Sequence, residues 1–152
     1  DLTPEDNAYL HRRFFRPEPR LAFATLARNL MSSAIDVSDG LHADAGHLAK
    51  ASAVRLRINL EQLPFSESVL GLTSEAERVN AALYGGDDYE LCFTAETAYR
   101  GQIDSVAASA GLRVTAIGEV QHGSGVSLFD RGVAAPANHQ RGFDHFSRVE
   151  KP

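Results

Sequence analysis

Two carboxylates and a hydroxyl group lie close together in residues 33–47, SAIDVSDGLHADAGH, where a short apolar run ends and a helical pattern begins. Asp36, Ser38 and Asp39 carry oxygen atoms of the kind that bind Mg²⁺ and phosphate groups. Residues three apart on a straight strand point to opposite faces, so the chain must turn at residues 38–40 to bring the carboxylates together. This spacing favours a site for a magnesium-bridged polyphosphate.

A strand and a helix are needed to position these groups. Ile35 and Val37 are typical of a buried strand, and apolar residues recur at near-helical spacing after Gly40. Asp39 is a typical helix N-cap, and the first turn of a helix presents N–H groups and a partial positive charge to an anion. An alternative needs no ligand: Asp39 only caps the helix, and Asp36 is a solvated residue at the end of the strand.

A second polar stretch, YGGDDYELCF, covers residues 84–93. Its two glycines allow a sharp turn, Asp87 and Asp88 follow, and the alternating residues after them predict a strand. The acids precede a strand here, whereas in the first stretch they follow one. Taken alone, such a segment is more typical of a solvated turn. Its interest comes from its combination with the first stretch.

The remaining patterns predict an α+β domain in which several helices pack on a mixed β-sheet. Ser74 and Glu77 form a capping box for a helix that Gly85 is placed to end. Residues 113–120 and 126–130 are predicted to form a strand pair around a glycine-rich hairpin turn. Further patterns predict helices over residues 4–14, 21–30 and 96–110 and a half-buried strand over residues 54–60.

Size and composition exclude several classes of protein. The 152 residues, 43% of them hydrophobic, suit one ordinary domain. The net charge of −5 argues against a partner that is a nucleic acid or an anionic membrane. A single cysteine excludes an intrachain disulfide, and no apolar run approaches the roughly 20 residues of a transmembrane helix, so we expect a cytoplasmic protein. Because the first residue is Asp1, we expect this chain to be part of a longer protein.

Five segments, in this order, resemble the C-terminal half of the thiamine-monophosphate kinase family. This family belongs to the superfamily of aminoimidazole ribonucleotide synthetase and selenophosphate synthetase. The matching segments are residues 9–20, 34–41, 83–93, 117–120 and 142–146. The resemblance implies one C-terminal domain over residues 1–152, with the fold of the synthetase C-terminal domain. The N-terminal ATP-binding domain of the full-length protein would be absent from this chain.

The resemblance also implies an activity and its partners. The full-length enzyme would use ATP and Mg²⁺ to phosphorylate thiamine monophosphate to thiamine diphosphate. The γ-phosphoryl group would pass directly to the substrate, so no catalytic nucleophile is expected. A homodimer is implied as well, and the fragment is expected to be inactive without its N-terminal domain.

Individual residues take roles only through this resemblance. Asp36 and Asp39 would be Mg²⁺ ligands, and the hydroxyl of Ser38 would contact ATP. Asp87 would contact the substrate, at a position where the family usually has a glutamate, and Phe143 would pack against the thiamine group.

Two alternatives remain open at the level of the sequence. The first is another ATP-using enzyme of the same superfamily, of the synthetase or the selenide-activating type. The segment GGDDYEL and the tail GFDHF argue against it. The second is a non-catalytic dimerisation or interaction domain, in which the aspartates serve only as caps.

Overall fold

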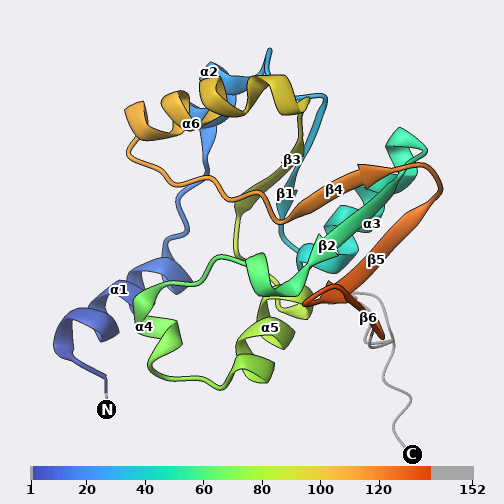
Figure 1. The fold of residues 1–152 in the computed structure, drawn as a ribbon. Helices are drawn as coiled ribbons and strands as arrows, with labels where there is room; N and C mark the ends of the chain where they lie inside the picture. Colours follow the sequence, from blue (N-terminus) through green and yellow to red (C-terminus); the bar gives the residue numbers. More distant parts are fainter. Residues whose placement is uncertain (1, 138–152) are drawn as a thin grey trace, which may run out of the picture.

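The computed structural model of the protein describes residues 2–137, which form helices and strands in the mixed order of an α+β domain (Figure 1). The helices are α1 Pro4–Phe15, α2 Leu21–Ala27, α3 Leu41–Ser52, α4 Glu67–Leu70, α5 Glu75–Tyr84 and α6 Arg100–Ser109. The strands are β1 Ser33–Val37, β2 Arg55–Asn59, β3 Glu90–Thr94, β4 Gly118–Gln121, β5 Gly125–Asp130 and β6 Val133–Ala135. Short 3₁₀ turns cover Leu60–Gln62 and Thr97–Tyr99.

The described strands form two sheets. β1 and β3 make an antiparallel pair, and the other strands form a sheet in the order β4-β2-β5-β6. β2 is antiparallel to β4 and parallel to β5, so the larger sheet is mixed. The predicted α+β class with helices on a mixed sheet is therefore confirmed.

The predicted pairing of β4 with β5 is wrong. β2 lies between these two strands and pairs with both, as Figure 1 shows. Leu56 and Ile58 of β2 are buried, and the central position of this strand pairs its backbone on both edges. A sequence pattern identifies strands but does not contain their order, and the glycine-rich turn joins two strands that do not pair with each other, so it is not a hairpin turn.

Helix α3 lies at the centre of the main core. It packs against β1, β2, β5 and α5. The buried members of this core are Val37, Leu41, Ala45, Leu48, Ala49, Leu56, Ile58, Leu63, Leu83 and Leu128. A smaller core joins α2 to α6 through Phe23, Ala27, Ile103 and Ala107, and these helices lie together beside the β1–β3 pair in Figure 1. The residues that follow β1 therefore lead directly into the main core.

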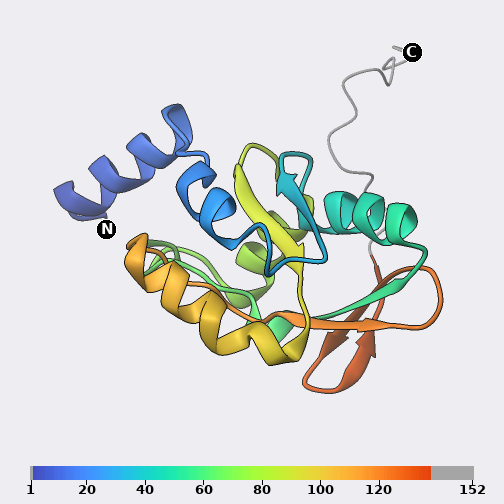
Figure 2. The same ribbon diagram turned by 90° about the horizontal axis from the view of Figure 1, so that it is seen from above.

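Side chains close in the sequence cap the starts of α1 and α5. Thr3 accepts a hydrogen bond from the backbone N–H of Asp6 at the start of α1, and Ser74 and Glu77 form the expected capping box of α5. Helix α1 contributes no buried residue and projects from the rest of the domain (Figure 2). In the described part of the chain, no helix is long and apolar enough to cross a membrane.

Candidate functional site

The two polar stretches of the sequence meet where β1 pairs with β3. Asp36 lies opposite Leu91, and Val37 lies opposite Glu90. Beyond this register, the N–H of Tyr89 donates to the carbonyl oxygen of Val37 over 2.8 Å. The backbone therefore holds the end of β1 against the loop that enters β3.

Two glycines permit this close approach. Gly40 has a φ of +98°, a conformation that residues with side chains rarely adopt. A Cβ atom on Gly40 would lie 2.8 Å from the carbonyl oxygen of Leu83, and one on Gly86 would lie 2.7 Å from that of Ser38. Both distances are too short for a side chain, so glycine is required at these two positions.

Asp36 and Asp39 both leave their carboxylates available. Asp36 lies on the exposed face of β1, and Asp39 is half-buried in the turn that follows. Within residues 2–137, the two carboxylates make no hydrogen bond or ion pair, and the hydroxyl of Ser38 makes no hydrogen bond. These are hard oxygen donors, as Mg²⁺ requires.

The described part of the chain does not supply a complete metal centre. Among its residues, no group of three or more His, Cys, Asp or Glu side chains is arranged to hold a metal ion. Mg²⁺ commonly binds through one or two protein carboxylates, and waters and substrate phosphates complete its coordination. The donor set of Asp36 and Asp39 therefore fits a Mg²⁺ ion that also binds a polyphosphate.

The prediction that Asp39 caps the helix is wrong. The N-cap of α3 is Gly40, without a capping side chain. The N–H groups of Ser38 and Asp39 both donate to Oδ2 of Asp44 over 2.9 Å. The positive φ of Gly40 separates Asp39 from the helical backbone, and Asp44 takes two N–H groups that an anion would otherwise contact.

Sequence reasoning missed the importance of Asp44. Its side chain is only 3% exposed and lies on the face of α3 that also buries Leu41, Ala45 and Leu48. The available signal was the helical spacing itself, which places an acid on the apolar face. A buried carboxylate on such a face requires hydrogen-bond donors, and the preceding turn supplies them.

Asp87 lies in the loop before β3, as the second polar stretch predicts. Its φ is +68°, and that of Tyr89 is +51°, so both residues adopt the left-handed conformation that is costly for side chains. Asp87 is exposed, and the hydroxyl of Tyr89 donates weakly to its Oδ1 over 3.4 Å. Desolvation, and next the charge of Glu90, raise the pKa of Asp88, although solvent screens this effect because the residue as a whole is exposed.

Arginines from the first part of the chain hold the start of β3. Arg20 donates from Nε and Nη2 to the two carboxylate oxygens of Glu90 over 2.8 and 2.6 Å, and Arg13 binds the same carboxylate. Desolvation alone would raise the pKa of Glu90, but the hydrogen bonds and charges of these arginines lower it overall. This bidentate contact ties the connector between α1 and α2 to the strand that carries the second polar stretch.

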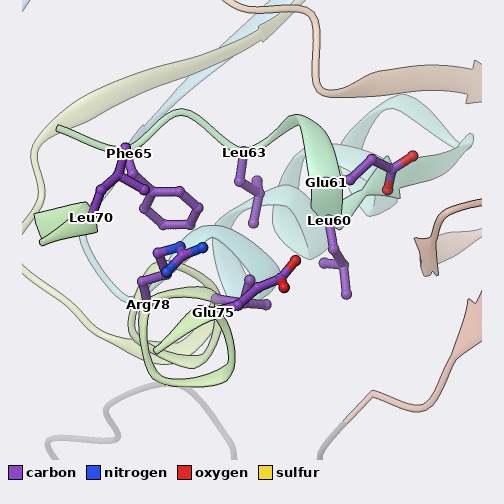
Figure 3. A pocket seen from close by; sticks show the side chains of 8 residues that line it. Leu60, Glu61, Leu63, Phe65, Leu70, Glu75 and Arg78 are labelled. Atoms are coloured by element: carbon purple, nitrogen blue, oxygen red, sulfur yellow. The ribbon is translucent and has the colours of Figure 1, made fainter. Parts of the chain in front are cut away.

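A hollow elsewhere on the domain contains none of the predicted site residues (Figure 3). Its volume of about 230 Å³ is below the range usual for small-molecule sites. It is lined by Leu60, Glu61, Leu63, Phe65, Leu70, Glu75, Arg78 and Val79. The backbone N–H of Arg131 donates to Glu61 over 3.2 Å, and its guanidinium donates to Glu75 over 3.0 Å, so both acids at this hollow already have a hydrogen-bond partner. Of the predicted site residues, only Phe143 lies outside the described part of the chain.

Known proteins are similar to this chain in both sequence and fold. The family described as "AIR synthase related protein, C-terminal domain" matches residues 2–131. Thiamine-monophosphate kinase of Escherichia coli K12 is 38% identical over 143 residues, which cover 94% of this chain and 44% of the relative. The chain therefore spans less than half the length of the curated relatives that it matches.

Two solved structures extend the comparison. Thiamine-monophosphate kinase from Stenotrophomonas maltophilia K279a has a TM-score of 0.80 and 39% identity, over 89% of this chain and 42% of that one. A structure of AaThiL complexed with AMPPCP and TMP has a TM-score of 0.72 and 31% identity, over 96% of this chain and 43% of that one. This chain thus belongs to the family of AIR synthase related proteins, whose C-terminal domain it contains, and its relatives named here are thiamine-monophosphate kinases.

Proposed function

We propose that this chain is the C-terminal domain, over residues 1–152, of an ATP-dependent kinase that phosphorylates thiamine monophosphate to thiamine diphosphate. The observation that carries the proposal is the junction of the two polar stretches, which holds Asp36, Ser38 and Asp39 beside the loop of Asp87. The relatives that match most of the chain are kinases of this kind, and one of them was solved with AMPPCP, an ATP analogue, and TMP.

Asp36 and Asp39 are proposed to hold Mg²⁺. When bound, the ion would neutralise charge on the polyphosphate during transfer. The unpartnered hydroxyl of Ser38, between the two carboxylates, would donate a hydrogen bond to a phosphate oxygen of ATP. In this way the turn after β1 would bind the metal and orient the nucleotide with residues adjacent in the sequence.

Asp87 and Phe143 are proposed to contact the substrate. Asp87 is exposed in the loop that contacts this turn, which supports its role. Its side chain is one methylene shorter than the glutamate usual in the family, so the substrate must approach this loop more closely. Phe143 would pack against the apolar part of thiamine, and this assignment depends on the family resemblance alone.

The chemistry requires no protein nucleophile, because the acceptor is a phosphate oxygen of the substrate. Positioning and charge neutralisation would provide the acceleration. Cys92 is unsuited to attack, since desolvation, and next the charge of Asp44, raise the pKa of its thiol to about 11.

The rest of the active site is proposed to come from outside this chain. The relatives are more than twice as long as the matched segment, and an N-terminal domain would bind most of the ATP. We further propose that the complete enzyme is a cytoplasmic homodimer and that this domain is inactive alone.

The test joins this chain to the part of the Escherichia coli kinase that lies outside the match, in one polypeptide called here the joined kinase. Formation of thiamine diphosphate from thiamine monophosphate is measured with ATP and Mg²⁺, with the 152-residue chain alone as the control. We expect turnover by the joined kinase and none by the chain alone. Turnover by the isolated chain would contradict the proposed division. A folded joined kinase that binds neither ATP nor thiamine monophosphate would favour the interaction-domain alternative.

A further inference from the structure

Asp44 is the only buried charged residue in the part of the chain that the structure describes. It forms no ion pair there, and its carboxylate accepts hydrogen bonds from two backbone groups, the N–H of Ser38 and the N–H of Asp39. Taking a carboxylate out of water is costly unless donors replace the lost water. An apolar residue would pack on this face of α3 without that cost, so the specific contribution of Asp44 is its pair of hydrogen bonds to the turn.

The hydrogen bonds continue from Asp44 to the second polar stretch. The N–H of Ser38 donates to Asp44, and the carbonyl oxygen of Ser38 accepts from the N–H of Asp87 over 2.9 Å. Asp87 and Tyr89 both have positive φ angles, a costly conformation that persists only when surrounding contacts fix it. The Ser38 backbone thus connects the buried carboxylate of α3 to the strained loop before β3.

We propose that Asp44 is a positioning residue that holds the turn of Ser38 and Asp39, and through it the loop of Asp87, in the geometry that binds a divalent cation. The inference rests on the proposed metal site of Asp36 and Asp39. Asp44 points its carboxylate at the backbone of the turn, while Asp39 keeps its own carboxylate unpartnered. The two acids therefore have different roles: Asp44 fixes the backbone of the turn, and Asp39 contacts the ion.

The test uses the 152-residue chain with Mn²⁺ as a paramagnetic substitute for Mg²⁺. NMR line broadening gives the Mn²⁺ affinity, and amide hydrogen exchange gives the protection of the N–H groups of Ser38 and Asp39. The variants are Asp44→Ala, which removes the acceptor, and Asp44→Asn, which keeps an acceptor oxygen without the charge. Leu48→Ala is the control, because it weakens the same buried face of α3 without touching the turn.

We expect Asp44→Ala to weaken Mn²⁺ binding by at least about tenfold and to speed exchange of both amides by a similar factor. Asp44→Asn retains affinity within about threefold of the wild type, because its amide oxygen still accepts from the turn. Leu48→Ala keeps the wild-type Mn²⁺ affinity although it unfolds at a lower temperature.

Three outcomes would overturn the inference. Equal losses in Asp44→Asn and Asp44→Ala would mean that the charge of Asp44, not its position, attracts the ion. If Asp44→Ala does not fold, the Asp44→Asn variant decides alone, and a loss beyond about tenfold overturns the inference. Loss of affinity in Leu48→Ala would show that general loosening is sufficient.

The failure of the proposed metal site would look different. In that case Asp36→Asn and Asp39→Asn would bind Mn²⁺ as the wild type does. The exchange rates of the Ser38 and Asp39 amides would still report whether Asp44 holds the turn.

Discussion

The backbone N–H of Asp87 donates to the carbonyl oxygen of Ser38 over 2.9 Å, and this contact joins the two polar stretches of the chain. Gly86 precedes Asp87 and lies so close to Ser38 that a Cβ atom would stand 2.7 Å from the same oxygen. The contact therefore requires both the hydrogen bond and a glycine at position 86.

Gly86→Ala tests this contact. The new methyl group must displace the carbonyl of Ser38, so we expect a loss of about 1–3 kcal/mol in the free energy of unfolding. Urea denaturation measures it. Gly46→Ala is the matched control, because Gly46 lies in α3 with nothing within 4 Å of its Cβ position. That variant should gain up to about 1 kcal/mol from helix propensity. Equal effects of the two substitutions would contradict the close approach.

The ion pair of Glu90 predicts a dependence of stability on acidity. The pKa of Glu90 is lowered in the fold, so its contribution is complete above its ordinary value of 4.5 and is lost as the pH falls through the lowered value. Glu90→Gln should cost about 1 kcal/mol at neutral pH, a modest figure because the carboxylate is partly exposed. The difference from the wild type, measured by urea denaturation, should shrink as the pH falls below 4.5.

The control for this prediction is Glu96→Gln, at an exposed acid that forms no ion pair within residues 2–137. It should leave the unfolding curve nearly unchanged at each pH. A Glu90→Gln difference that stays constant from neutral to acidic pH would mean that the lost contact is not ionic.

Cys92 should be unreactive in the folded protein. With its pKa raised to about 11, the thiol holds less than about a hundredth of the thiolate that an ordinary cysteine has at pH 8. Alkylation with iodoacetamide should therefore be slow in buffer and fast in denaturant, as mass spectrometry would measure. Labelling of the native chain at the unfolded rate would contradict the desolvation of this side chain.

Local sequence patterns were sufficient to predict many of the helices and strands. Thr3 caps α1, and Ser74 and Glu77 form the capping box of α5. The partners in each cap are three residues apart, so a short stretch of sequence is enough to recognise them. Strand order is different, because β2 enters between β4 and β5 through long-range packing. Alternating apolar residues show that a strand exists but not which strands lie beside it.

The sequence likewise predicted some parts of the candidate site and not others. The oxygen-bearing side chains of Asp36, Ser38 and Asp39 indicated a site from the sequence. In the structure, their turn contacts the loop of Asp87. Asp39 as a cap was wrong because the left-handed φ of Gly40 moves the helix start by one residue. The role of Asp44 depends on which face of α3 is buried, and that requires the packed fold.

The most direct test of Asp36 and Asp39 as metal ligands is the affinity of the joined kinase for AMPPCP, measured by calorimetry with and without Mg²⁺. Asp36→Asn and Asp39→Asn are compared with the wild type and with Asp104→Asn, an exposed acid on α6. If Asp36 and Asp39 bind the ion, Mg²⁺ strengthens AMPPCP binding in the wild type and in Asp104→Asn. Each of the other substitutions then lowers the affinity for AMPPCP in the presence of Mg²⁺ by at least about tenfold. Equal Mg²⁺-dependent binding in all four folded proteins would contradict the assignment of Asp36 and Asp39 as metal ligands.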